Sequence, residues 1–245
     1  MELPTFGPIQ CDFDAAWVDL PAVRCHAGKV SESALTTAKV DADDDRLLLA
    51  AAVRSWTRIV AWLLSVGGSI GFVASFVLTV ERFELAADPD YVPSCNFNPV
   101  LSCGSVMAEP QAALFGFPNP LLGIAGFAIA VTTGVALLAG AHLAGWYWAG
   151  LQVGVTAAMV FISWLIYSSL YSIGALCPYC MVVWAVTLPI FVFVTVRNAH
   201  ASGLTSRSRV ALALARNHAP ILVAAVGLVI VLIAVRFWSY WSSLY

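Results

Sequence analysis

The chain has 245 residues, of which 60% are apolar and 11% charged, with a formal net charge of −2 at pH 7. Soluble domains average about 45–50% apolar and about 25% charged residues. Too little polar surface remains to cover a water-facing globule, so the composition predicts an integral membrane protein. No basic patch indicates nucleic acid as a partner.

The order of polar and apolar segments predicts a tail followed by five membrane helices. Residues 1–45 contain nine of the fourteen acidic residues, which is typical of a disordered cytoplasmic tail or of a mis-assigned translation start. One crossing takes roughly 20 apolar residues, and backbone groups in hydrocarbon must be satisfied internally, so we expect helices. Their predicted ranges are about 59–80, 118–140, 146–172, 177–196 and 219–236.

The arginines predict the orientation of these helices. Three arginines precede the first apolar segment: Arg46, Arg54 and Arg58. Four more lie between the fourth and fifth segments: Arg197, Arg207, Arg209 and Arg216. Because cytoplasmic loops carry an excess of basic residues, the N-terminus and the basic loop 201–218 are expected in the cytoplasm. The loop 81–117, the start of the fourth helix and the tail of segment 219–245 then lie outside the cytoplasm. The predicted membrane domain spans residues 46–200.

Six cysteines divide into two groups under this orientation. Cys11 and Cys25 fall on the reducing side and are expected to be spare thiols. The other four, in the loop 81–117 and at the start of the fourth helix, occupy the compartment where disulfides persist.

The sequence Cys177-Pro178-Tyr179-Cys180 begins the fourth predicted helix. A C-x-x-C pair can open and close a disulfide, and a helix N-terminus stabilises the thiolate that exchange requires. Pro178 suits the first helical turn, where its missing N–H costs nothing. The alternative is half of a structural zinc site.

Cys95 and Cys103 form a second pair, with seven residues between them. Alone, this pair favours a static disulfide in a loop. Beside a C-x-x-C pair it indicates a relay, in which one dithiol meets a protein thiol and the other an electron acceptor. No charged residue occurs from 110 to 196, so a lipophilic quinone suits the membrane edge. No G-x-G-x-x-G follows a strand, so we expect no nicotinamide cofactor.

The segment before the second predicted helix offers a quinone site. Asn119 could donate its amide to a quinone carbonyl, with Phe115 and Phe117 stacked on the ring. The alternative, compatible with the first, is that Asn119 caps the helix and Pro120 occupies its first turn. The motifs Gly67-x-x-x-Gly71 and Gly150-x-x-x-Gly154 predict close helix packing.

Three stretches together resemble the vitamin K epoxide reductase family, in its bacterial, actinobacterial-like, disulfide-forming branch. They are YVPSCNFNPVLSCGSVM at 91–107, FGFPNPLLGI at 115–124 and SLYSIGALCPYCMVVW at 169–184. The similarity covers roughly residues 56–196. It implies an all-α membrane protein with a four-helix bundle around a quinone, to which this chain adds a fifth helix.

The resemblance also implies roles for single residues. Cys180 would face the quinone, Cys177 would exchange with Cys103, and Cys95 would exchange with an external partner. Asn119 matches the quinone-binding asparagine of the family. Trp184 stands where the vertebrate enzymes carry a tyrosine that hydrogen-bonds the substrate, so this chain departs from them there.

The expected activity is therefore that of a membrane thiol–quinone oxidoreductase without a metal. It would re-oxidise a separate thioredoxin-fold, DsbA-like protein outside the cytoplasm and reduce a membrane quinone, menaquinone in particular. One alternative enzyme class is the unrelated DsbB-type oxidase, which the F-G-x-x-N segment and the helix-start C-P-Y-C disfavour. Another alternative is a non-catalytic membrane protein with structural disulfides or a four-cysteine zinc site.

Overall fold

The computed structural model describes residues 47–242 apart from 49 and 89. The predicted tail 1–45, with Cys11 and Cys25, lies outside the described residues. Within the described part, five helices are long and apolar enough to cross a membrane: Ala50–Ala87, Pro120–Leu138, Gly145–Ile173, Pro178–Ala201 and His218–Arg236.

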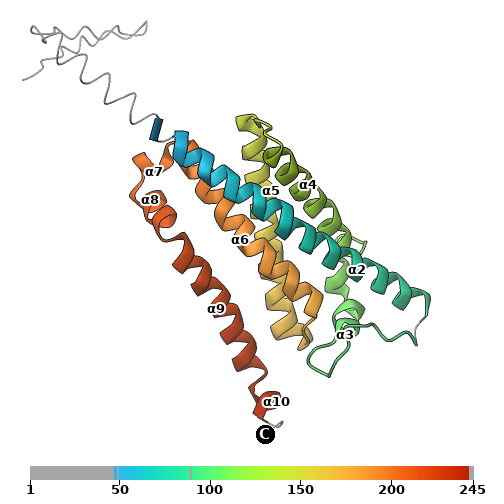
Figure 1. Cartoon of the computed structure of the whole chain (residues 1–245). Coiled ribbons are helices and arrows are strands. Elements are labelled where there is room, and N and C mark those ends of the chain that lie inside the picture. The colour runs from blue at the N-terminus through green and yellow to red at the C-terminus, as the bar shows by residue number, and fades with distance from the viewer. Residues whose placement is uncertain (1–46, 49, 89, 243–245) are drawn as a thin grey trace, which may run out of the picture. The chain divides into compact units, whose positions relative to one another are not determined.

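Figure 1 shows these helices side by side in the unit that begins at residue 51. The first contains a π-helical turn, η1 (Leu63–Gly67), and ends as α2 (Gly68–Ala87). The others are α4 (Pro120–Leu138), α5 (Gly145–Tyr167) with its continuation η3 (Ser168–Ile173), α6 (Pro178–Ala201) and α9 (His218–Arg236). Short helices join them: α3 (Cys103–Ala108), η2 (Pro110–Ala113), α7 (Leu204–Arg207), α8 (Arg209–Arg216) and α10 (Trp238–Ser242).

The bundle is centred on α2 and α6. The helix α2 packs against α4 and α6, and α6 also packs against α5 and α9. A Cβ at Gly71 would collide with the ring of Phe127, so α2 and α4 approach closely there, as the motif Gly67-x-x-x-Gly71 predicts. By contrast, α4 and α5 are not among the closely packed pairs, although they are consecutive in the chain.

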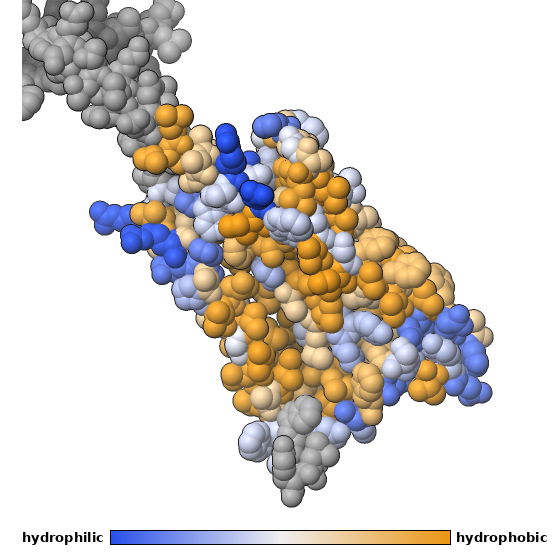
Figure 2. All heavy atoms as spheres, viewed as in Figure 1, coloured by the Kyte–Doolittle hydropathy of each residue, from blue (hydrophilic) through white to orange (hydrophobic). Residues whose placement is uncertain are grey.

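Apolar side chains cover the outside of this unit. On the face that Figure 2 shows, hydrophobic residues predominate along the helices, and the most hydrophilic residues lie toward the ends. In the most apolar 18-residue stretch of α9, no residue is buried inside the protein. Such a surface is stable only against lipid. The prediction of an all-α integral membrane protein is confirmed.

Several boundaries differ from the prediction. The first helix begins at Ala50 and not near residue 59, and the fourth continues to Ala201 and does not end near residue 196. The first helix continues past residue 80 to Ala87, so Glu81 and Arg82 lie on α2 and not in a loop. The charge of Glu81 does not end the helix because Tyr91 and Ser94 hydrogen-bond to its carboxylate. The predicted basic loop 201–218 contains the short helices α7 and α8.

The fifth helix contacts other elements at both ends, and at its start the ring of His218 lies 4.9 Å from that of Trp56 and 5.4 Å from that of Phe193. Arg236 donates from Nε to the carbonyl oxygen of Leu170 in η3, at 2.8 Å. Phe237 is buried in a cluster that includes Leu176 and Trp184. The end of α9 is therefore packed against the segment that leads to the C-x-x-C motif.

Candidate functional site

Cys95 and Cys103 are joined by a disulfide, with their Cα atoms 5.7 Å apart. Cys95 lies in the segment after α2, and Cys103 is the first residue of α3. Neither sulfur-bearing side chain is accessible, with exposed fractions of 2% and 0%. The segment between α2 and α4 thus carries a buried disulfide at one end of the bundle, which we call the cysteine end.

A short piece of strand-like pairing brings this disulfide to the C-x-x-C motif. Leu101 and Leu176 form a parallel bridge. The N–H of Ser102 donates to the carbonyl of Leu176 at 2.9 Å, and the N–H of Leu176 donates to the carbonyl of Val100 at 2.7 Å. Because Cys103 and Cys177 directly follow the paired residues, the sulfurs of these two cysteines meet at 3.1 Å.

Cys177 is the N-cap of α6. Its sulfur accepts the backbone N–H of Cys180 at 3.4 Å, and Pro178 occupies the first turn. The side chain of Cys180 lowers the pKa of the Cys177 thiol by hydrogen bonding, and the backbone N–H groups of Cys180 and Tyr179 lower it further, whereas burial opposes them. Thiolates are the reactive form in disulfide exchange, so this environment favours the reaction.

The two pairs are in different redox states. Cys177 and Cys180 are free thiols beside the Cys95–Cys103 disulfide. Four thiolates for a tetrahedral zinc site are therefore not present together in this state. Among the described residues, no group of three or more His, Cys, Asp or Glu side chains could hold a metal ion.

A cavity of about 670 Å³ begins at the C-x-x-C motif and extends between the helices. Cys177 and Cys180 both line it, as do Asn119, Phe115 and Trp184. Arg82 is the one charged residue among the described residues that line it. The other lining groups are mainly apolar, and most of them come from α2, α4, α5 and α6, with a few from α3, η2 and η3. An elongated apolar ligand of drug size or larger fits such a space.

Asn119 lines this cavity and occupies the N-cap position of α4. Its side chain makes no capping hydrogen bond. The amide Nδ2 donates to the carbonyl of Gln111 at 2.7 Å, and Oδ1 accepts the N–H of Leu114 at 3.2 Å. The predicted positions of Asn119 at the N-cap and Pro120 in the first turn are confirmed, but the side chain of Asn119 does not cap the helix. Asn119 ties the turn at 110–114 to the start of α4, and its amide keeps one further N–H.

The two predicted stacking rings differ in position. Phe115 lines the cavity, whereas Phe117 is not among the lining residues and packs on Phe115, with ring centroids 6.1 Å apart. Trp184 is buried in the wall. The structure thus brings Cys180, Asn119, Phe115 and Trp184 to one cavity and leaves Phe117 behind Phe115.

Three residues that line the cavity, Gly150, Gly154 and Gln111, were not predicted from the sequence as site residues. Gly150 and Gly154 line the cavity, and a Cβ at either would meet nothing within 4 Å, so their predicted role in close packing is wrong. Gln111 lines it with a buried Oε1 that has no hydrogen-bond partner. The spacing of the two glycines was the available signal, because it places both on one helix face.

Residues 62–195 of the chain match the sequence model of the vitamin K epoxide reductase family. A comparison with curated proteins finds no match. The matched range covers more than half of the chain and includes all four cysteines of the site, while α9 lies beyond it. The disulfide next to a C-x-x-C pair, on a helical membrane bundle, agrees with the disulfide and quinone chemistry of that family. The chain belongs to the vitamin K epoxide reductase family.

Proposed function

We propose that this protein oxidises the dithiol of a thioredoxin-fold, DsbA-like partner and reduces a membrane quinone, menaquinone in particular. Family membership supports thiol and quinone redox chemistry in general. The observation that carries the specific proposal is the 3.1 Å approach of the Cys103 and Cys177 sulfurs, with Cys180 of the same C-x-x-C pair lining an apolar cavity.

The transfer runs inward through two exchanges. A partner thiolate attacks Cys95, the Cys95–Cys103 bond breaks, and the second partner thiol resolves the mixed disulfide. Once Cys177 and Cys180 are oxidised, the Cys103 thiolate attacks Cys177 and Cys180 leaves as a thiolate. Cys95 then attacks Cys103 and Cys177 leaves, so that the disulfide returns to the outer pair. The partner loses two electrons and two protons, and the dithiol of Cys177 and Cys180 gains both.

The inner dithiol then delivers its electrons in the cavity. Cys180 is the thiol that meets the quinone, and Cys177 closes the disulfide with it, so that quinone plus dithiol becomes quinol plus disulfide. The two protons come from the thiols and, in turn, from water at the cysteine end. No Asp, Glu, Lys or Arg occurs between 110 and 196 to carry protons from the opposite end.

The shape of the cavity supports a quinone with a long apolar tail. The lining runs from Cys180 along α4 and α5 to Trp146 and Tyr147, at the far end of α5. The ring fits between Asn119, Phe115 and Trp184, and the tail fits the glycine-lined part. Trp184 presents an indole N–H where a tyrosine hydroxyl serves the vertebrate relatives, so we propose that vitamin K epoxide is not a substrate.

The orientation in the membrane is part of the proposal. The cysteine end faces outside the cytoplasm, and the N-terminus and α8, with Arg209 and Arg216, face the cytoplasm. The partner dithiols occur in exported proteins, which fold in the oxidising compartment.

The test is quinone reduction by the purified protein in lipid nanodiscs with a dithiol donor. Wild type should reduce menaquinone, and Cys180→Ala should lose the activity by a factor of about 10³ or more, because the reacting sulfur is gone. Cys25→Ala is the matched control, since it removes a thiol outside the relay. Activity retained in Cys180→Ala would refute the proposed acceptor step.

A further inference from the structure

Glu81 is a buried carboxylate that the thiol exchanges do not use. It lies on α2 with an exposed fraction of 6%. A carboxylate in such a place is stable only when hydrogen bonds satisfy its oxygens. Three donors do so: the hydroxyl of Tyr91 at 2.9 Å, the backbone N–H of Ser94 at 3.2 Å, and the hydroxyl of Ser94.

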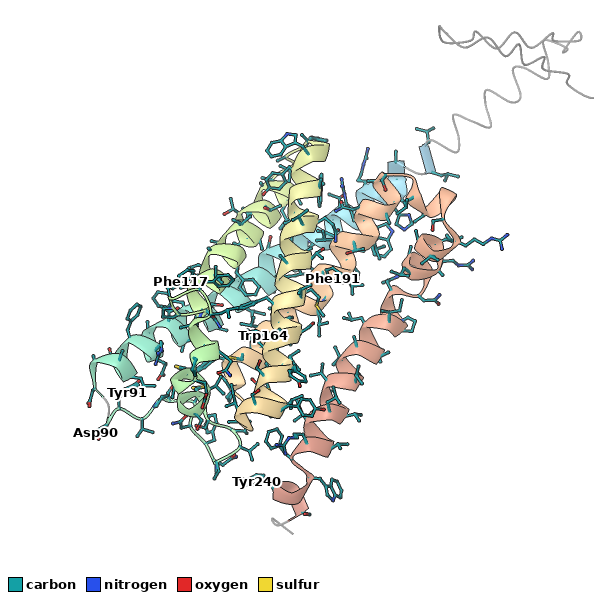
Figure 3. The ribbon with its side chains drawn as sticks, turned by 180° about the vertical axis from the view of Figure 1, so that it is seen from behind. Asp90, Tyr91, Phe117, Trp164, Phe191 and Tyr240 are labelled. Carbon is teal, nitrogen blue, oxygen red and sulfur yellow. A yellow bond between two sulfur atoms is a disulfide. The ribbon has the colours of Figure 1, made fainter. Side chains whose placement is uncertain are left out.

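All three donors come from the segment that directly precedes Cys95. Figure 3 labels Tyr91 in this segment, close to the end of α2. The hydrogen bond to Glu81, burial, and the charges of Glu81 and Glu84 raise the pKa of Tyr91, so its hydroxyl stays protonated and donating at neutral pH. Charge-assisted hydrogen bonds of this kind are the strong ones in proteins.

The segment is also fixed on the other side of Cys95. Oδ1 of Asn96 accepts the hydroxyl of Ser102 at 3.2 Å and the N–H of Gly104 at 3.0 Å. Cys95 is thereby kept against Cys103 and away from solvent. A thiolate from another protein cannot reach its sulfur until the segment before it moves outward, and that movement must break the bonds to Glu81.

We propose that Glu81 is a positioning residue that latches the segment 91–94 to α2, so that Cys95 is buried until this latch opens to an external dithiol. The inference rests on the proposed exchange at Cys95. With the latch closed, Cys103 lies beside Cys177 and the inner exchange is favoured. With the latch open, an external thiolate attacks Cys95, and Cys103 leaves with the bonding electron pair as a thiolate.

The variant Glu81→Gln keeps the side-chain shape but replaces one acceptor oxygen with an N–H donor. That donor faces the hydroxyls of Tyr91 and Ser94, so the latch weakens. The Cys95–Cys103 disulfide of the full chain, in nanodiscs without quinone, is reduced with a water-soluble phosphine and followed by maleimide labelling. We expect reduction about tenfold faster than in wild type, because a strong hydrogen bond to a charged group no longer opposes opening.

Glu84→Gln is the matched control, since it makes the same change in charge one turn along on the exposed side of α2. Its rate should equal that of wild type. Tyr91→Phe removes one donor only and should give an intermediate rate with little risk to folding. Equal rates in wild type, Glu81→Gln and Tyr91→Phe would overturn the proposal, as would equal acceleration in Glu84→Gln.

A second measurement separates a latch from a general loss of structure. In steady-state turnover with a dithiol partner, Glu81→Gln should raise kcat/KM for the partner and lower kcat, because opening is easier and the inner exchange is less often aligned. A damaged fold would lower both. The phosphine experiment needs no quinone, so a wild type that fails to reduce quinone refutes the proposed function and leaves the latch to be decided by the reduction rates.

Discussion

Three cysteine side chains at the cysteine end, Cys95, Cys103 and Cys177, are at most 2% exposed and have fixed neighbours, whereas the cavity beside them is about 670 Å³ of mainly apolar space. The first region sets the distance between two sulfurs through backbone pairing of this chain alone. The second leaves room for a ligand. Substitutions should therefore separate the two regions: those at the cysteine end should stop exchange and spare quinone binding, and those in the cavity should do the reverse.

The largest effect is expected for Cys103→Ala. Without this sulfur, electrons from the partner cannot reach Cys177, and partner-dependent quinone reduction should fall by a factor of about 10³ or more. Quinone binding, measured by titration of the purified protein, should stay as in wild type. Cys95 is then an unpaired thiol that attacks the oxidised partner, and the resulting mixed disulfide should accumulate on non-reducing gels.

The control is the double variant Cys95→Ser with Cys103→Ala, which should form no mixed disulfide. If Cys103→Ala alone also forms none, Cys95 is not the exchange point. A protein whose disulfide is only structural would behave in that way.

The next effect concerns the cavity. Gly154 lines the cavity, and a Cβ there would meet nothing within 4 Å. The variant Gly154→Leu therefore adds a side chain to the cavity and takes room from the tail of a quinone. A misfit of this size costs roughly 1–3 kcal/mol, which corresponds to a rise in KM for quinone of about 10–200-fold. The rate of exchange between the partner and Cys95 should not change, because the substitution lies far along α5 from the cysteine end.

Gly227→Leu is the matched control. A Cβ at Gly227 also meets nothing within 4 Å, but this residue lies on α9 and does not line the cavity. Its KM should equal that of wild type. An unchanged KM in Gly154→Leu would mean that the acceptor does not occupy this part of the cavity.

The parts of the molecule that sequence could predict depend on local signals. Long apolar segments without charge predict helices in lipid, and all five appear near their expected positions. Pro178 before an apolar run marks a helix start, so the C-x-x-C pair at the N-terminus of α6 was also predictable.

The parts that sequence could not predict depend on contacts between distant segments. The pairing of Leu101 with Leu176, which brings Cys103 to Cys177, has no local signature. The continuation of α2 beyond residue 80 requires the donors of Tyr91 and Ser94 to satisfy Glu81. The same Gly-x-x-x-Gly spacing occurs in two different environments. A neighbouring helix approaches Gly71 closely through the ring of Phe127, whereas nothing lies within 4 Å of a Cβ at Gly154.

A smaller effect is expected in the pH dependence of the reactivity of the free Cys177 thiol. Its pKa is lowered first by the Cys180 side chain, so the thiolate forms at lower pH than for a free thiol, whose pKa is about 8.5. The rate should rise with pH and level off below that value. In Cys180→Ala the donor is lost, and the rise should move to higher pH. Alkylation of Cys177 by iodoacetamide at a series of pH values, followed by mass spectrometry with the Cys95–Cys103 disulfide intact and the C-x-x-C pair reduced, would measure both profiles.

The smallest effect on turnover is expected at the end of α9. Phe237→Ala removes a ring buried with Leu176 and Trp184, so the free energy of unfolding should fall by about 3 kcal/mol and Tm with it. The sulfurs and the cavity lining stay in place, so turnover at saturating quinone should change little. Val235→Ala, on the exposed side of the same helix, should change neither quantity. Loss of turnover in Phe237→Ala at a temperature where the protein is folded would mean that the fifth helix, which lies outside the family match, takes part in aligning Cys177. Leu176 would carry that effect, because it belongs to the same buried cluster as Phe237 and forms the backbone bridge with Leu101.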